Sequence, residues 1–237
     1  MADIETIERV ADVAVGAAPG VSGGRAAGGR SSRQGSRFLR EFLANPIATA
    51  AIAPSSRHLA AAMLRGVEMG SLSTVVEFGP GTGVFTRAVL EGLRASGNEG
   101  ALFLAIEKNG RMARELGAEL GVLDGAESSG PRARVIEGDA LEVDVLLQRH
   151  GAREADFILS GLGWPSIPAG IRDAILEKTA AALGRGKQFR TFGYHIGLTL
   201  PGAWGFRRTV RRLFSRVEIS RVVWRNLPPA FVYTCTK

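Results

Sequence analysis

From residue 73 onward, short apolar runs alternate with longer segments in which apolar residues recur every three or four positions. The short runs are typical of β-strands and the periodic segments of α-helices. The expected strands are 73–78, 101–107, 132–138, 155–160 and 188–195, and the expected helices are 84–95, 109–120, 140–149 and 169–183. Continuous apolar runs such as 102–106 suit strands that are covered on both faces. The alternation therefore predicts an α/β fold, a mostly parallel sheet flanked by helices.

The last part of the chain departs from this alternation. Two strand-like runs, 214–224 and 230–236, are separated by Asn226-Leu227-Pro228-Pro229. This separation leaves no room for a crossover helix, which a parallel pair of strands would need. An antiparallel C-terminal hairpin is therefore expected to complete a sheet of seven strands.

The first 70 residues have a different character. Residues 1–36 are rich in Gly, Ala and Ser, a composition that predicts a flexible leader. A short amphipathic helix is expected from residue 37 until Asn45-Pro46 stops it. A second helix is expected from Arg57 to about residue 67, with an N-cap in Pro54-Ser55-Ser56. We therefore expect a leader (1–36), N-terminal helices that cap the active site (37–70) and one α/β domain (71–237).

The composition excludes several classes of protein. The chain has 237 residues, 45% of them hydrophobic, which is enough to bury a core without a metal or a disulfide. It contains one cysteine, Cys235, and three histidines far apart in sequence, so no metal site is expected. No apolar run is long enough to span a membrane, and the acidic N-terminus does not resemble a secretory signal. A cytoplasmic protein is expected, either free or bound peripherally to the inner face of the membrane.

The net charge of +7 is unevenly distributed. Residues 31–66 contain five basic and one acidic residue, and residues 185–237 contain eleven basic and one acidic residue. Residues 67–184, in contrast, contain eleven basic and seventeen acidic residues. Two basic flanks therefore surround an acidic middle. Such flanks favour a polyanion, either nucleic acid or anionic lipid, and the charge does not distinguish between the two.

Three glycines follow the first expected strand and precede the first expected helix, in the pattern Glu77-x-Gly79-x-Gly81-x-Gly83. A turn of this kind at the carboxyl edge of a sheet binds a ligand in many α/β proteins. A P-loop would end in Gly-Lys-Ser/Thr, which is absent. A dinucleotide fingerprint would have its third glycine at position 84, which is Val84. The carboxylate of Glu77 would repel a pyrophosphate but tolerate a sulfonium, which favours S-adenosylmethionine.

Acidic residues also follow the next two strands. Glu107 ends the second strand, where a carboxylate can accept both hydroxyl groups of a ribose. Asp139 follows the third strand and is placed to accept from the exocyclic amine of adenine. We count their neighbours Lys108 and Ala140 with them as cofactor-binding residues, together with Ser160 after the fourth strand.

At this point the sequence resembles the class I S-adenosylmethionine-dependent methyltransferases, over roughly residues 55–237. The resemblance implies a Rossmann-like fold. The finer match is to the bacterial phospholipid N-methyltransferases, which methylate phosphatidylethanolamine stepwise toward phosphatidylcholine. The motifs that carry it are Phe42-Leu43-x-x-Pro46, Ala51-Ile52-Ala53-Pro54-Ser55-Ser56-Arg57, Val76-Glu77-x-Gly79-Pro80-Gly81-Thr82-Gly83-Val84-Phe85-Thr86, Ser160-Gly161-Leu162 and Arg225-Asn226-Leu227-Pro228-Pro229-Ala230-x-Val232-Tyr233.

The ribosomal RNA adenine dimethyltransferases are similar in the glycine loop and are the alternative. They carry Asn-Leu-Pro-Tyr/Phe after the fourth strand, where this chain has Ser160-Gly161-Leu162-Gly163-Trp164. The lipid enzymes commonly have Pro in the place of Gly163, and the chain lacks a close match to their aromatic stretch near 192–200. A third hypothesis, from another class, is a binding module that keeps the cofactor fold without turnover.

The resemblance to N-methyltransferases implies an acceptor amine, which must lose a proton before it attacks the methyl group. Ser160 and Tyr194 are the expected positioning residues for this amine, with His195 more readily explained as a structural histidine. Once the amine becomes quaternary, an aromatic face is its suitable partner, and Trp164 is the candidate, with a plain hydrophobic role as the equal alternative.

The basic flanks supply candidate contacts to the substrate or membrane. Four arginines fall on one side of a helix whose other side is apolar, a pattern suited to an anionic membrane surface and equally to RNA phosphates. A solvated face that balances the acidic domain is the alternative explanation. The expected contact residues are Arg37, Arg40, Arg57, Arg207, Arg208, Arg211 and Arg212.

Overall fold

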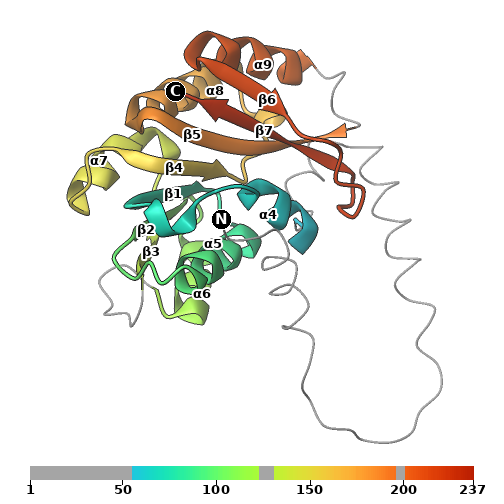
Figure 1. The fold of residues 1–237 in the computed structure, drawn as a ribbon. Coiled ribbons are helices and arrows are strands. Elements are labelled where there is room, and N and C mark those ends of the chain that lie inside the picture. Colours follow the sequence, from blue (N-terminus) through green and yellow to red (C-terminus); the bar gives the residue numbers. More distant parts are fainter. Residues whose placement is uncertain (1–54, 123–130, 196–200) are drawn as a thin grey trace, which may run out of the picture.

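The computed structural model describes residues 55–122, 131–195 and 201–237. These residues form one seven-stranded sheet in the order β3-β2-β1-β4-β5-β7-β6 (Figure 1). The strands are β1 (Thr74–Phe78), β2 (Leu102–Glu107), β3 (Arg132–Glu137), β4 (Ala155–Ser160), β5 (Leu183–Tyr194), β6 (Arg216–Ile219) and β7 (Ala230–Thr236). The first five strands pair in parallel, and β7 is antiparallel to both β5 and β6. The predicted sheet and its antiparallel C-terminal hairpin are confirmed.

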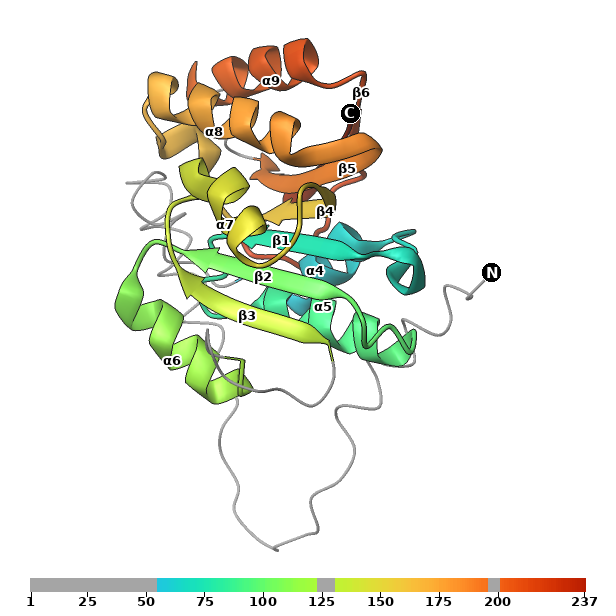
Figure 2. The same cartoon turned by 90° about the vertical axis from the view of Figure 1, so that its left-hand side faces the viewer.

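Helices cover both faces of the sheet, as the turned view shows (Figure 2). On one face lie α4, α5 and α6, and on the other lie α7, α8 and α9. Their bounds are α4 (Arg57–Leu64), α5 (Val84–Ala95), α6 (Gly110–Leu120), α7 (Val143–Arg149), α8 (Ala169–Ala182) and α9 (Pro201–Leu213). Short 3-10 helices occur at η1 (Met69–Ser71), η2 (Ala140–Glu142) and η3 (Trp164–Ser166).

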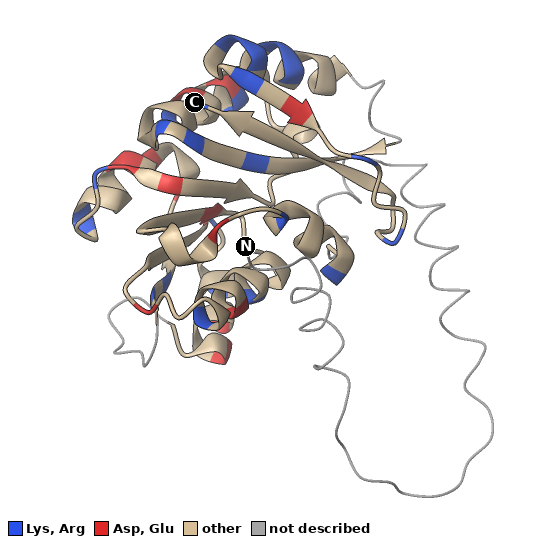
Figure 3. Ribbon diagram, viewed as in Figure 1, with Lys and Arg blue, Asp and Glu red and all other residues tan. Residues whose placement is uncertain are grey.

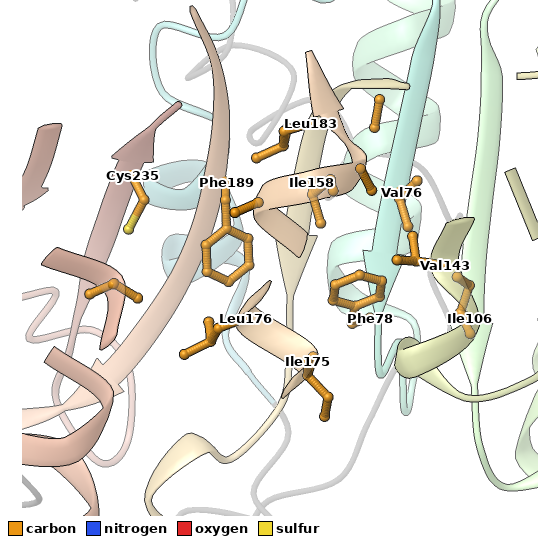
Figure 4. Packing of buried hydrophobic residues seen from close by; sticks show 14 of the residues in the cluster. Val76, Phe78, Ile106, Val143, Ile158, Ile175, Leu176, Leu183, Phe189 and Cys235 are labelled. Atoms are coloured by element: carbon orange, nitrogen blue, oxygen red, sulfur yellow. The ribbon is translucent and has the colours of Figure 1, made fainter. Parts of the chain in front are cut away.

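Two apolar clusters hold these layers together. The cluster under α7, α8 and α9 contains Val76, Ile158 and Phe189, which are paired side by side on β1, β4 and β5 (Figure 4). The cluster on the other face contains Val75, Phe103 and other strand residues that point to the opposite side of the sheet. Apolar residues of α4 and α5 pack against them. Both faces of β1 are buried along its whole length. Its run of apolar residues therefore reflects a central strand that is covered on both sides.

Two strand boundaries differ from the prediction. β5 begins at Leu183, directly after α8, whereas the sequence predicted a strand only from 188. The segment 184–187 contains two glycines and resembles a turn, yet Leu183 pairs with Ala155 before a shift in register. In the hairpin, β6 stops at Ile219 although the strand-like run extends to 224, and beyond it Val223 and Ala230 form an isolated bridge. β6 is an edge strand, and short edge strands are common in natural sheets.

The predicted helix 37–44, together with Arg37, Arg40 and the leader, lies outside the described residues. Helix α4 begins where predicted, because the hydroxyl of Ser56 accepts a hydrogen bond from the backbone N–H of Leu59 at 3.2 Å. Among the residues that the structure describes, no helix is long and apolar enough to cross a bilayer, and no group of acidic, histidine and cysteine side chains could hold a metal ion.

Candidate active site

The glycine loop joins β1 to α5 at the carboxyl edge of the parallel strands. Gly79, Gly81 and Gly83 all have positive φ angles, of 66°, 55° and 78°. This left-handed region is costly for residues with a Cβ atom, so the three glycines allow a turn that other residues would strain. The loop is also tied to its neighbour strand, because the N–H of Gly79 donates to the carbonyl of Ile106 at 2.9 Å.

A fourth glycine, Gly161, packs directly against this loop. Its N–H donates to the carbonyl of Phe78 at 2.8 Å. A Cβ atom added at Gly161 would lie 2.5 Å from the carbonyl oxygen of Gly79, well inside van der Waals contact. The turn after β4 and the glycine loop therefore depend on a glycine at 161 for their close approach, a role that the sequence analysis did not assign to it.

Glu107 lies at the end of β2, and its carboxylate faces the glycine loop. One oxygen accepts from the N–H of Gly81 at 3.2 Å, and the other accepts from the N–H of Asn109 at 3.0 Å. The side chain is partly exposed. The structure thus brings together two of the predicted cofactor-binding features, and the carboxylate keeps lone pairs for the hydroxyl groups of a ribose.

Asp139 follows β3 and caps the short helix η2, which begins at Ala140. One carboxylate oxygen accepts from the N–H of Leu141 at 3.0 Å, and the other accepts from the ammonium of the exposed Lys108 at 2.8 Å. These two hydrogen bonds lower the pKa of Asp139, the one to the backbone contributing most. Asp139 is therefore ionised at neutral pH and remains able to accept further hydrogen bonds.

Glu77 is the most unusual group in this region, because its carboxyl is completely buried. One oxygen accepts from the hydroxyl of Thr86 at 2.8 Å, and Thr86 lies in the first turn of α5. The other oxygen, Oε1, has no hydrogen-bond partner among the described residues. Burial raises the pKa of Glu77 to about 8, with the negative charge of Glu107 adding to the rise. The carboxyl is thus kept largely neutral at pH 7 in this state.

Ser160 and Trp164 are brought together, but inside the core. The indole N–H of Trp164 donates to the hydroxyl of Thr191 at 2.8 Å, and that hydroxyl donates to the carbonyl of Ser160 at 3.0 Å. The ring of Trp164 is 2% exposed and packs against Phe189 and Phe206. The prediction that Trp164 faces a methylated ammonium is wrong in this arrangement, because other side chains cover its ring. Its hydrophobic alternative is the one observed.

The hydroxyl of Ser160 is also fully buried. It accepts a hydrogen bond from the N–H of Leu162 at 3.1 Å and so shapes the turn after β4. This position supports the turn that carries Gly161. A direct contact between Ser160 and an acceptor amine stays a prediction.

Tyr194 is the last residue of β5 and belongs to a small aromatic group that reaches the start of α5. The ring of Phe85, at the start of α5, contacts the ring of Phe192 edge-on at 5.7 Å, and Phe192 contacts Tyr194 at 5.5 Å. Both β5 residues are partly exposed. Burial raises the pKa of Tyr194 to about 12, so it is a neutral phenol at physiological pH. His195, the next residue, is exposed and lies 6.0 Å from the ring of Trp224.

The four arginines of α9 do not form one uniform face. Arg207 is partly buried and donates to the hydroxyl of Tyr233 at 2.8 Å, whereas Arg212 pairs with Glu177 at 2.9 Å. Arg208 and Arg211 are exposed. Arg57, at the start of α4, is exposed as well.

Four residues that support this site were not predicted from the sequence. Thr86 and Thr191 satisfy buried groups, and Phe85 and Phe192 extend the aromatic group around Tyr194. Thr86 carried a usable signal, since it opens the helix after the glycine loop and a buried carboxyl needs a donor. Phe192 carried a weaker signal, because it lies two residues before Tyr194 and so shares a face of the strand with it.

The residues at this edge fit a cationic ligand that also carries a ribose. The unpartnered oxygen of Glu77 is a buried acceptor, which a positively charged group would satisfy. Glu107 offers the acceptor pair for ribose hydroxyls beside the loop. S-adenosylmethionine has both features, and so agrees with the donor and acceptor groups that the structure presents.

We expect Gly161→Ala to weaken binding of S-adenosylmethionine by at least about tenfold, because the new Cβ must push the β4 turn away from the Gly79 carbonyl. Isothermal titration calorimetry measures this. Gly163→Ala is the matched control, since a Cβ there meets only the side chain of Ser166, at 3.2 Å. Equal affinities in the two variants would contradict the role assigned to Gly161.

Glu77 also predicts a pH-dependent stability. The folded protein holds a proton on Glu77 up to about pH 8, whereas the unfolded chain releases it near the ordinary value of 4.5. Stability contributed by this proton is therefore complete below the unfolded pKa and is lost as pH rises through the folded pKa. Glu77→Gln should remove this loss, which is on the order of a few kcal/mol.

Urea denaturation of both proteins at about pH 5 and about pH 8.5, near the two ends of the window, measures the difference. The free energy of unfolding should fall more between these values in the parent protein than in Glu77→Gln. The exposed Glu119→Gln serves as control and should follow the parent protein. A parallel decline in parent and Glu77→Gln would show that Glu77 is ionised in the fold.

The comparisons with known proteins give the same assignment. The chain is 30% identical over 200 residues to the ornithine lipid N-methyltransferase of Singulisphaera acidiphila, which covers 84% of this chain and 93% of that protein. It is 44% identical over 80 residues to the ribosomal RNA small subunit methyltransferase A of Caulobacter vibrioides, covering 34% of this chain and 26% of that one. No family model matches the sequence.

Solved structures share the fold. An O-methyltransferase from Bacillus cereus in complex with SAH covers 98% of this chain and 97% of its own, with a TM-score of 0.58 and 15% identity. The mitomycin 7-O-methyltransferase MmcR has a TM-score of 0.51 and 18% identity, and the match covers 88% of this chain and 59% of MmcR. The sequence similarity extends over 93% of the Singulisphaera enzyme, and the solved structures share the fold. The chain therefore belongs to the class I S-adenosylmethionine-dependent methyltransferases.

Proposed function

We propose that this methyltransferase transfers methyl groups to the amino head group of a membrane lipid. The observation that carries the proposal is the similarity to an ornithine lipid N-methyltransferase, which extends over 93% of the length of that relative. The motifs shared with phospholipid N-methyltransferases point to phosphatidylethanolamine as the acceptor, with phosphatidylcholine as the final product. The relative's name instead points to an ornithine lipid. Both head groups offer an amine nitrogen as the acceptor atom.

An RNA adenine methyltransferase is the second candidate, supported by the 44% identity to the ribosomal RNA enzyme over 80 residues. That match covers 26% of the RNA enzyme. The turn after β4 reads Ser160-Gly161-Leu162-Gly163-Trp164, without the Asn-Leu-Pro-Tyr/Phe of that family. The ring of Trp164 is buried in the core, so it is not available to stack on a flipped base. The lipid acceptor is therefore the better supported of the two.

We assign the cofactor to the carboxyl edge of β1, β2 and β3. Gly79, Gly81 and Gly83 would let the backbone approach it closely, Glu107 would accept from its ribose, and Asp139 would accept from its adenine amine. S-adenosylmethionine supplies a methyl group carried on a positively charged sulfur. The chain's own contribution is to position the acceptor nitrogen and to exclude water, the main sources of rate in such a transfer.

The acceptor amine must arrive without its extra proton. A primary amine resembling that of lysine has an ordinary pKa near 10.4, so it is an ammonium at neutral pH. A water-poor pocket lowers this pKa because it disfavours the charged form. Tyr194, a neutral phenol at the end of β5, can hold the amine by a hydrogen bond, but its own pKa of about 12 argues against a role as a base.

The aromatic group around Tyr194, rather than Trp164, is the proposed partner of the methylated ammonium. Phe192 and Tyr194 are partly exposed, lie on one face of β5 and are linked to Phe85 at the start of α5. A methylated ammonium cannot donate many hydrogen bonds and is attracted to aromatic faces. We therefore place the growing methylated head group beside these rings.

The substrate is tested with purified full-length protein and radiolabelled S-adenosylmethionine. Vesicles of phosphatidylethanolamine, vesicles that contain ornithine lipid and unmethylated ribosomal RNA are offered separately. We expect label in lipid and none in RNA, with the ratio between the two lipids fixing the head group. The Glu107→Ala variant, which lacks the ribose acceptor, should lose transfer to every substrate. Label in RNA alone would refute the lipid proposal.

A positioning role for Tyr194 predicts that Tyr194→Phe lowers kcat/KM for the lipid acceptor by about tenfold, the cost of one hydrogen bond in the transition state. The KM for S-adenosylmethionine should not change. The pH profile should keep its shape, because no titrating base is removed. Tyr233→Phe is the matched control, since the hydroxyl of Tyr233 is bonded to Arg207 beneath α9. A lost limb in the pH profile of Tyr194→Phe would identify Tyr194 as the base instead.

A further inference from the structure

Several large apolar side chains are exposed on the surface of the molecule. Among the described residues, the large ones are Val145, Ile171, Trp204, Ile219, Trp224 and Leu227. The first three lie in the opening turns of α7, α8 and α9, each of which follows a strand of the parallel set. Since such helices start at the carboxyl edge of the sheet, Ile171 and Trp204 lie near that edge. The other three come from β6 and the connection that follows it.

The β6–β7 connection, residues 220–229, also lies at this edge. β6 and β5 are both antiparallel to β7, so β6 ends at the same edge as the parallel strands (Figure 1). His195, at the end of β5, donates its backbone N–H to the carbonyl of Pro229 at 2.8 Å. The connection is therefore on the side of the glycine loop and of Tyr194.

Two large apolar side chains project from this connection. Trp224 is 71% exposed and Leu227 is 48% exposed. Burying either side chain in an apolar medium is favourable. The fold does not require either of them to be exposed to water. Tryptophan in addition prefers the boundary between water and lipid, because its ring is apolar and its N–H is polar.

The same connection is basic. Arg221 and Arg225 are exposed, and no acidic residue occurs from 219 to the last residue, 237. Figure 3 shows basic residues on this connection and acidic residues elsewhere on the domain. Arginine beside tryptophan and leucine is the composition of a surface that binds anionic lipid, through buried apolar area and electrostatic attraction together.

The connection is held in a fixed shape. Asn226 is 2% exposed, and its amide donates to the carbonyl of Pro228 at 2.7 Å. Its side-chain oxygen accepts from the N–H of Ser56, at the start of α4, at 2.8 Å. The N–H of Val223 donates to the carbonyl of Ala230 at 2.6 Å. Because these bonds order the backbone beforehand, little conformational entropy is left to lose on docking.

We propose that the β6–β7 connection is a membrane-docking element, which inserts Trp224 and Leu227 into the head-group region of a bilayer that contains anionic lipid. Arg221 and Arg225 then lie against lipid phosphates. The inference rests on the proposed function in one respect: docking at this edge brings a lipid amine to the site. Aliphatic groups such as Leu227 and Ile219 favour a bilayer over RNA, since they gain little against bases or phosphates.

The test compares three double variants of the full chain with the parent. Trp224→Ser with Leu227→Ser removes the apolar tip, and Arg221→Ala with Arg225→Ala removes its charge. Arg149→Ala with Arg153→Ala is the control, because both arginines are exposed near the start of β4, at the opposite edge of the sheet. Calorimetric binding of S-adenosylhomocysteine checks that each variant is folded.

Vesicle flotation is measured on phosphatidylethanolamine vesicles with and without phosphatidylglycerol, an anionic lipid. The apolar variant should bind both at least about tenfold more weakly than the parent. The charge variant should lose affinity for the anionic vesicles only and should show a shallower salt dependence. The control pair should bind like the parent. Parent protein that does not bind vesicles, or loop variants that bind them normally, would overturn the proposal.

Methyl transfer separates this inference from the proposed function. The apolar variant should lose transfer to vesicles but keep it toward short-chain phosphatidylethanolamine dispersed as monomers. If no lipid is methylated by any form while vesicle binding still depends on Trp224 and Leu227, the proposed function fails and the docking element stands. Binding of ribosomal RNA that depends on the connection, without a matching dependence for vesicles, would overturn the docking element in favour of RNA.

Discussion

The backbone hydrogen bonds that continue past the ends of the parallel strands fix the shape of the candidate active site. The N–H of Gly79 reaches the carbonyl of Ile106, and the N–H of Gly161 reaches the carbonyl of Phe78. These bonds extend the ladders of β1 with β2 and with β4 by one step each. They place the glycine loop, the Glu107 carboxylate and the β4 turn next to one another. Everything else at the site is arranged around that junction.

The cost of this arrangement is concentrated at Glu77. A carboxyl at the end of a central strand cannot reach water, and the hydroxyl of Thr86 satisfies only one of its oxygens. An apolar residue there would suit the core better. A binding site for a cation, however, needs an acceptor that is already desolvated and held in place. Burial raises the pKa of Glu77, which reflects the cost of holding a carboxyl inside the core.

The sequence predicted the layers well because they depend on patterns that are local. Helix α5 has the expected bounds, and β4 does as well, since the apolar period and the glycine turns are visible in a short window. The start of β5 at Leu183 was not visible, because its pairing with Ala155 is a long-range contact made through a shift in register. The same limit applies to Trp164. Its place in a loop after β4 was predicted, but only the packing of Phe189 and Phe206 shows that its ring is covered.

The carboxyl edge must serve two demands that differ in chemistry. On the cofactor side proposed above, the carboxylates of Glu107 and Asp139 would be repelled by an anionic surface, whereas the buried Glu77 is largely neutral. The proposed docking element lies at the other end of the sheet order, beyond β5. It contains Arg221 and Arg225 and no acidic residue. Screening reduces the interaction between the two regions once they are separated by about 10 Å or more at moderate salt. Placing the acid at β1 to β3 and the basic, apolar connection at β6 and β7 therefore lets one edge hold a cationic cofactor and still approach an anionic membrane. Between them, β5 carries Tyr194, where a lipid amine and the cofactor would meet.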